Sequence, residues 1–175
     1  LGTFYQGYCQ AHLGRGNEGI AQMERSDATL QASGTTGGDT SRSAFLAEAC
    51  AMAGQPEKAM DVLAQGLAHV EERGERYWEA ELRRLKGELL LSQGESHSEA
   101  EASCEKAIEV ARQQHAKSWE LRATMSLARL WKEQGKQGET RQRLAEIYGW
   151  FTEGFDTADL KDAKALLDDL SRPEA

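Results

Sequence analysis

Proline is nearly absent from this sequence, with only Pro56 and Pro173 among its 175 residues. Aromatic residues are also scarce, at 7%. Because proline interrupts helices, whereas alanine, glutamate, glutamine, leucine and arginine favour them, this composition predicts an all-helical protein. No apolar run approaches the roughly 20 residues that a helix needs to span a bilayer, and no signal-peptide pattern opens the chain. We therefore expect no membrane partner.

Cysteine and histidine are few and scattered, which argues against disulfide and metal chemistry. Cys9, Cys50 and Cys104 have no metal-ligand spacing, and no two of the four histidines stand four residues apart. Buried thiols behave as small apolar groups, so we expect three reduced, structural cysteines in a cytoplasmic protein. No metal or other cofactor is expected.

Catalytic motifs are equally scarce. The segment from Ser33 to Ser41 contains glycines, as a phosphate-binding loop does, but Asp39 and Thr40 stand where that loop has glycine and lysine. An acid at this place repels phosphate, so we interpret the segment as a flexible connection between repeats. No pattern brings a nucleophile, a base and an oxyanion donor together. We expect no enzymatic activity in this chain.

Regularly spaced glycines are the strongest signal that the sequence contains. Four of them end helix-like apolar stretches at intervals of 40, 40 and 41 residues: Gly14, Gly54, Gly94 and Gly135. Seven residues before each of these glycines stands a small residue: Gly7, Ala47, Gly87 and Ala128. Five or six residues after each stands a second, mostly small residue: Gly19, Ala59, Ala100 and Thr140. Small residues let two helices approach closely. The period therefore predicts a stack of helix–turn–helix units.

This unit resembles the tetratricopeptide repeat, although that repeat is about 34 residues long. The resemblance implies a right-handed α-α superhelix, a solenoid, formed by one domain over residues 1–175. We expect repeats at 1–32, 41–72, 76–115 and 117–152. The expected helices cover 2–13, 17–32, 41–53, 56–72, 76–93, 98–115, 117–134, 137–152 and 157–171. The chain begins in mid-helix without a methionine, which predicts a piece of a longer polypeptide.

The last expected helix, at 157–171, departs from the repeat pattern. Leucines form one stripe, with Leu160, Leu166, Leu167 and Leu170, and charged residues occupy the remaining positions. Since the end of a solenoid needs a polar outer face, we predict that this helix caps the array. A second packing prediction concerns Trp78, Trp119 and Trp131, which we expect to be mainly core residues.

Charge is unevenly distributed along the chain. The net charge is −8, yet residues 112–143 hold eight Lys or Arg against three acids, which is +5 and leaves −13 for the rest. A basic fourth repeat in an acidic array could attract an acidic protein surface, or it could be a solvated helix face. The overall negative field, without aromatic residues alternating with the basic ones, excludes nucleic acid as an expected partner.

The first helix of each tetratricopeptide pair lines a concave groove, and the same offsets give a candidate partner-binding groove here. Its residues are Phe45, Glu48 and Met52 from the second repeat, Arg84, Leu85 and Glu88 from the third, and Arg122, Met125, Arg129 and Lys132 from the fourth. The same offsets in the first repeat give Phe4, Tyr5, Tyr8 and His12. The first three either line the groove or pack against a preceding repeat. This surface suits a peptide or helix with an apolar end and an acidic end. We expect Arg84, Arg122 and Arg129 to be exposed and to contribute to binding more than to folding.

A closer family resemblance rests on several stretches of sequence. They are ERGERYWEAEL at 72–82, RLKGELLL at 84–91, SWELRA at 118–123, SLARLW at 126–131 and YGWFTEGFDTADLKDA at 148–163. These resemble the C-terminal tetratricopeptide region of bacterial class III adenylate/guanylate cyclase-linked ATPases and related multidomain signalling regulators. In that family an output domain and a nucleotide-hydrolysing domain precede the array, so the resemblance transfers no catalytic residue. It implies a non-catalytic regulatory module that binds a protein, a peptide or other domains of the same polypeptide. The alternative is a helical-repeat sensor of a small molecule that controls the output of the parent protein.

Overall fold

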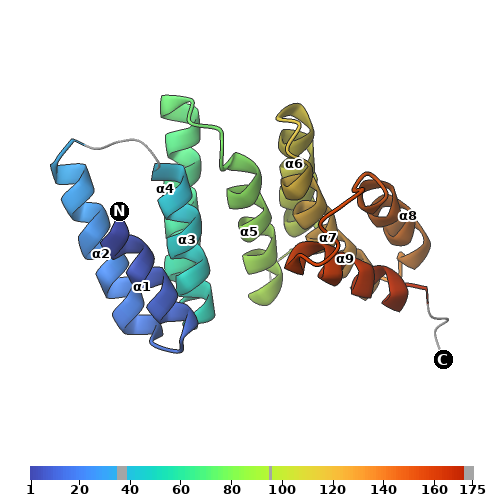
Figure 1. Cartoon of the computed structure of the whole chain (residues 1–175), viewed down its shortest axis with the longest axis horizontal. Helices are drawn as coiled ribbons and strands as arrows, with labels where there is room; N and C mark the ends of the chain where they lie inside the picture. Colours follow the sequence, from blue (N-terminus) through green and yellow to red (C-terminus); the bar gives the residue numbers. More distant parts are fainter. Residues whose placement is uncertain (35–38, 95, 172–175) are drawn as a thin grey trace.

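The structure, a computed structural model, describes residues 1–34, 39–94 and 96–171. Over these residues the chain forms helices and no strand: α1 (Gly2–His12), α2 (Gly16–Ala32), α3 (Asp39–Met52), α4 (Pro56–Arg73), α5 (Glu79–Ser92), α6 (His97–Gln113), α7 (Lys117–Glu133), α8 (Gln137–Tyr148) and α9 (Ala158–Asp169). The first eight pack as successive pairs that follow one another along the molecule, with α9 at the far end (Figure 1). The expected all-α helical-repeat solenoid is confirmed. Residues 35–38, in the segment interpreted as a flexible connection, lie outside the described residues.

The four periodic glycines form the turns within the helix pairs. Gly14, Gly54, Gly94 and Gly135 have φ angles between +70° and +85°, a left-handed conformation that glycine adopts without steric cost. Pro56 occupies the first turn of α4, where its missing N–H is not needed. Two helix bounds differ from the sequence expectation by about one turn. Residues 76–78 form a turn before α5 rather than its start, and α8 ends at Tyr148.

Small residues bring the two helices of a pair into backbone contact. A Cβ atom added to Gly7 would lie 2.6 Å from the carbonyl oxygen of Gly19, and one added to Gly19 would lie 2.4 Å from that of Gly7. In the third pair, a Cβ on Gly87 would lie 2.7 Å from Sγ of Cys104. These distances leave no room for a side chain. The small positions identified in the sequence therefore have the structural role that was expected of them.

The odd-numbered helices line the inner side of the array. Helix α1 contacts α3, α3 contacts α5, α5 contacts α7, and α7 contacts α9. Among the described residues, the even-numbered helices make no such contacts with one another. A stack in which only one helix of each pair meets its counterpart curves toward that helix. The concave side is therefore formed by α1, α3, α5 and α7.

The hydrophobic core extends along the array and includes most of the expected positions. Phe4 is fully buried against α2 and α3, so it needs no preceding repeat to cover it. Trp131 is also buried, with 4% of its surface exposed. Trp78 and Trp119 are half-buried and pack against apolar core clusters, so the prediction of mainly core tryptophans holds in full for Trp131 and in part for the other two.

Helix α9 packs against the last repeat. Leu160 and Ala163 of α9, and Leu170 directly after it, are buried in one cluster with Leu144 and Ile147 of α8 and with residues of α7. The opposite face of α9 is exposed and carries charged side chains. This packing is what a capping helix requires, and a functional cap stays a prediction that truncation can test.

The basic stretch at 112–143 is largely neutralised within the fold. All of its Lys and Arg residues except Arg129 and Arg141 form ion pairs with acids of the described part of the chain, several of them in other repeats. Arg122 pairs with Glu81, Lys136 with Glu101, Arg143 with Glu105 and Lys132 with Asp169 of α9. Four of these pairs connect neighbouring helices of different repeats or the last helix, and together the pairs offset much of the positive charge of the stretch. No helix in the described part of the chain has the length and apolarity needed to cross a membrane.

Candidate partner-binding groove

A cavity of about 490 Å³ opens on the concave side between α3 and α5. Five of the predicted groove residues line it: Glu48 and Met52 from α3, and Arg84, Leu85 and Glu88 from α5. Ala47, Ala51 and Leu89 add apolar wall. Met52 is 54% exposed and Ala51 is exposed, so the cavity is open to solvent along its rim. Its volume lies within the range of about 300 to 1,000 Å³ that is usual for ligand sites.

Arg84 forms the polar floor of this cavity. Only 6% of its surface is exposed. Its Nε and Nη2 atoms each donate to the Glu81 carboxylate at 2.8 Å, and Nη1 lies 2.6 Å from Oε1 of Glu88. Ser126 of α7 donates to the same Glu88 oxygen at 2.7 Å, and Arg122 of α7 donates to Glu81 at 2.7 Å. The expectation that Arg84 is an exposed binding charge is wrong, because two carboxylates already surround it.

The network fixes the charges of its members. Burial raises the pKa of the Glu88 carboxyl, but the Arg84 guanidinium and the hydrogen bond from Ser126 outweigh burial and hold this pKa below its ordinary value. Burial lowers the pKa of Arg84, and hydrogen bonds and charge from Glu81 and Glu88 more than compensate, so the net pKa is raised. Both groups are therefore ionised at neutral pH.

A second polar contact joins the first two repeats across the same side. Tyr8 of α1 donates its hydroxyl proton to Oε2 of Glu48 at 2.7 Å. Burial raises the pKa of Tyr8 well above its ordinary value, and the hydrogen bond to Glu48 adds to this effect. Tyr8, Glu48, Glu88 and Arg129 all stand six residues before their turn glycine, so one position of the repeat supplies a polar side chain from every odd-numbered helix of the four pairs.

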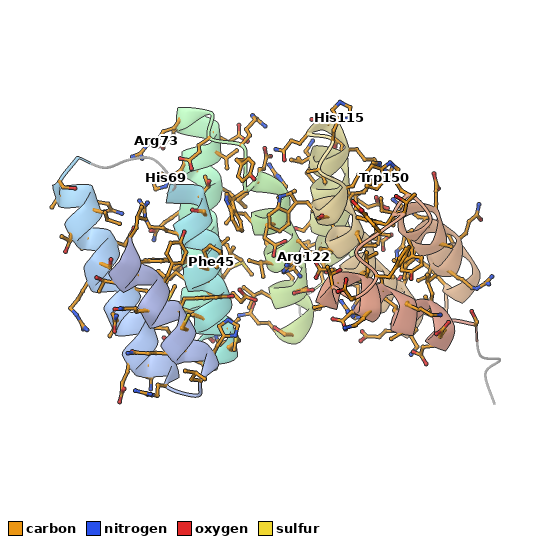
Figure 2. The ribbon with its side chains drawn as sticks, viewed as in Figure 1. Phe45, His69, Arg73, His115, Arg122 and Trp150 are labelled. Carbon is orange, nitrogen blue, oxygen red and sulfur yellow. The ribbon has the colours of Figure 1, made fainter. Side chains whose placement is uncertain are left out.

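Aromatic rings form a continuous row beside these polar groups. Ring centroids lie 4.9 Å apart between Tyr8 and Phe45, 5.1 Å between Phe45 and Trp78, and 5.0 Å between Trp78 and Trp119. The Arg122 guanidinium lies 5.5 Å from the Trp119 ring centroid. Phe45 and Arg122, which this row connects, both lie toward the middle of the array (Figure 2). The rings of Tyr8, Phe45, Trp78 and Trp119 are half-buried, which leaves part of each available to a partner.

The remaining predicted residues separate into two kinds. Met125 is 4% exposed and packs in the apolar cluster of α7, α8 and α9, so it does not reach the groove surface. Arg129 is exposed and Lys132 is half-buried, near the end of α7. The sequence reasoning missed Glu81 and Ser126, which are buried and pair with the groove residues Arg84 and Glu88, and it missed Trp78 and Trp119 of the aromatic row. For Glu81 a signal existed, because Glu81 and Arg122 both stand thirteen residues before their turn glycine.

Comparisons with solved structures identify the fold. One similar structure contains nearly identical TPR-like repeats, in a point variant of a Podosopora anserina protein assigned to the kinesin light chains. It superposes with a TM-score of 0.73 at 15% identity, and the match covers 97% of this chain and 83% of that one. The tetratricopeptide repeat sensor-containing STAND protein (Signal Transduction ATPase with Numerous Domains) from Pyrococcus horikoshii gives a TM-score of 0.76 at 12% identity, covering 96% of this chain. The present chain spans only 26% of that protein's length. No family model and no curated protein sequence matches the chain. At these identities the likeness establishes a tetratricopeptide-like fold and nothing about ligands.

Proposed function

We propose that this chain is a non-catalytic interaction module that binds a peptide segment or helix in its concave groove, from a partner protein or from another domain of its own polypeptide. The observation that carries the proposal is the open cavity between α3 and α5, flanked by the half-buried aromatic row. Rigid aromatic rings and apolar walls beside a few fixed polar groups are the usual components of a peptide-binding surface.

The parent protein in this proposal is a bacterial multidomain signalling ATPase or nucleotide cyclase. The sequence resemblance described above supports this assignment. The structural likeness to a STAND ATPase with a tetratricopeptide repeat sensor is compatible with it. In such a protein the array would regulate the output domain by binding one partner in one functional state.

A random library of displayed 12-residue peptides tests the proposed groove. In Ala51→Arg a long charged side chain is placed at an exposed position of the cavity wall. The matched control is Ala102→Arg, at an exposed position of α6 outside the row of odd-numbered helices. Peptides selected on the unmodified chain should bind the control equally and bind Ala51→Arg about tenfold more weakly or worse. Equal binding to all three proteins, or no enrichment of any peptide, would contradict the proposal.

The second candidate function is recognition of a small molecule, which the size of the same cavity favours. A metabolite screen by thermal shift distinguishes the two. A compound that raises the melting temperature of the unmodified chain, but not that of Ala51→Arg, would support the sensor if no displayed peptide binds. The wide opening of the cavity, with Met52 and Ala51 at its rim, is the reason that we favour the peptide.

A further inference from the structure

The polar position six residues before each turn glycine pairs the odd-numbered helices in three different ways. Between α1 and α3, the Tyr8 hydroxyl donates to Glu48. Between α5 and α7, Glu88 faces the positive charge of Arg129, which contributes to lowering the Glu88 pKa. Between α3 and α5, the position holds two carboxylates, Glu48 and Glu88, and both line the cavity. Like charges on neighbouring elements are unfavourable unless a cation lies between them.

Each of these carboxylates has one oxygen that no side chain of the described residues occupies. Oε2 of Glu48 accepts from Tyr8 and Oε1 of Glu88 accepts from Arg84 and Ser126, which leaves Oε1 of Glu48 and Oε2 of Glu88. The buried unpaired side-chain atoms of the described residues belong to His69 and Trp131 instead. The two remaining carboxylate oxygens are thus not buried unpaired atoms, and both are hydrogen-bond acceptors on residues that line the cavity.

The Arg84 guanidinium at the floor of the cavity does not pair with the two remaining carboxylate oxygens. Arg84 is the basic residue of the cavity lining, and its guanidinium already donates to Glu81 and Glu88. Arg122 behind it is paired with Glu81. The charged residues that line the cavity thus comprise two carboxylates, from Glu48 and Glu88, and one guanidinium group, from Arg84. Arg129 lies outside the lining and offsets part of the Glu88 charge. A ligand of this cavity gains most if it brings a positive charge with several donors.

We propose that the cavity between α3 and α5 binds the side chain of a lysine in the bound peptide, with its ammonium group between Glu48 and Glu88. The four-carbon stem of lysine would lie along the apolar wall of Ala47, Ala51, Leu85 and Leu89, as long basic side chains commonly do. The three donors of an ammonium group can reach two separate carboxylates, whereas a guanidinium favours one carboxylate in a planar pair. This inference rests on the proposed function, and it adds a basic residue to a partner for which the sequence suggested only apolar and acidic ends.

Two libraries of 12-residue peptides test the proposal, identical except that one fixes lysine and the other norleucine at a central position. Norleucine keeps the apolar stem and lacks the charge. On the unmodified chain, the lysine library should yield binders about tenfold tighter than those of the norleucine library. In Glu48→Gln the amide oxygen can still accept from Tyr8, so the fold is retained while the charge is removed. This variant should lose most of the lysine preference.

A matched control is Glu109→Gln, which removes the same charge from an exposed site on α6 that is paired with Lys106 and Gln113. It should keep the full lysine preference. Binders from both libraries that are equally tight, yet sensitive to Ala51→Arg, would overturn the lysine proposal and leave the proposed function standing. If neither library yields binders sensitive to Ala51→Arg, the proposed function itself fails.

Titration with cadaverine alone adds a third arm. Glu48-dependent binding of this free diamine without any lysine preference in peptides would overturn the peptide assignment in favour of a small amine.

Discussion

The third and fourth repeats differ in charge at three equivalent positions of their first helix, and the two outer positions carry opposite charges. Thirteen, ten and six residues before the turn glycine, the third repeat has Glu81, Arg84 and Glu88, and the fourth has Arg122, Met125 and Arg129. The middle position is buried in both, at 6% for Arg84 and 4% for Met125. The first two repeats bury Phe4 and Ala44 at this position.

This difference shows that the fold requires burial at the middle position but not an apolar side chain. A buried arginine is tolerated in the third repeat because Glu81 and Glu88, one turn away on either side, accept its hydrogen bonds. The fourth repeat has arginines at the flanking positions and an apolar residue between them. The two patterns are complementary, since Arg122 extends to Glu81 of the preceding repeat.

The largest effect that separates the two repeats should come from deleting residues 156–175. The third repeat is covered on both sides by other repeats, whereas α9 covers the outer side of the fourth. The deletion would expose Leu144 and Ile147, so we expect self-association and loss of cooperative unfolding. Light scattering and urea unfolding measure both effects.

The control for this deletion is Lys164→Ala, on the exposed face of α9. This change should alter neither association nor cooperativity. If the truncated chain instead stays monomeric with an unchanged urea midpoint, α9 is a detachable segment and the cap assignment is wrong.

The second effect concerns the middle position directly. Met125→Arg would bury a cation between Arg122 and Arg129 without a carboxylate, and we expect it to lower the free energy of unfolding by at least about 3 kcal/mol. Met125→Leu, which conserves volume, should cost less than about 1.5 kcal/mol. Met125→Glu should cost less than Met125→Arg because arginines flank it. Urea denaturation gives all three values, and equal costs for Glu and Arg would show that flanking charge does not matter.

The helix pattern could be predicted from sequence because it depends on local chemistry. Gly54 and Gly94 each end a helix through their own backbone conformation, and Gly7 packs through its own lack of a side chain. The candidate groove was predicted less well. Arg84 pairs with Glu81 and Glu88, its neighbours at i−3 and i+4 on α5, and this spacing is visible in the sequence. Its contact with Ser126 of another repeat depends on the packing of α5 against α7, which the sequence does not show. Helical offsets brought five of the predicted residues to one cavity, and they could not show pairs between repeats such as Arg122 with Glu81.

The third prediction, with a smaller expected effect, concerns how closely the two helices of each pair approach in these two repeats. The small position seven residues before the turn is Gly87 in the third repeat and Ala128 in the fourth. In Gly87→Ala the new methyl group would lie 2.7 Å from Sγ of Cys104 and 3.1 Å from the carbonyl oxygen of Ala100. We expect this overpacking to cost about 1 to 3 kcal/mol, despite the better helix propensity of alanine.

Two further variants complete this third test by urea denaturation. Ala128→Gly should cost only about 0.5 to 1 kcal/mol, through backbone entropy. Adding Cys104→Ala to Gly87→Ala should recover part of the loss, because it removes the sulfur atom that the methyl group meets. A stabilising Gly87→Ala would mean that α5 and α6 can separate without cost.

The smallest effect should appear on acidification, which changes the third repeat and leaves the arginines of the fourth charged. The pKa of Glu88 is lower in the folded chain than its ordinary value of 4.5, because Arg84 and Ser126 outweigh the effect of burial. The folded state therefore binds this proton less readily than the unfolded state. The resulting stability is fully present above about pH 4.5 and is lost as the pH falls through the lower, folded-state pKa. Since the Glu88 side chain is 39% exposed, solvent screens much of the interaction and the contribution is modest. Glu88→Gln should consequently lose less unfolding free energy than the unmodified chain between neutral pH and a pH below that folded-state pKa. Glu146→Gln, at an exposed position of α8, should behave like the unmodified chain. Urea unfolding at a series of pH values measures these differences, and identical pH profiles for Glu88→Gln and the unmodified chain would show that the third-repeat network does not depend on the Glu88 charge.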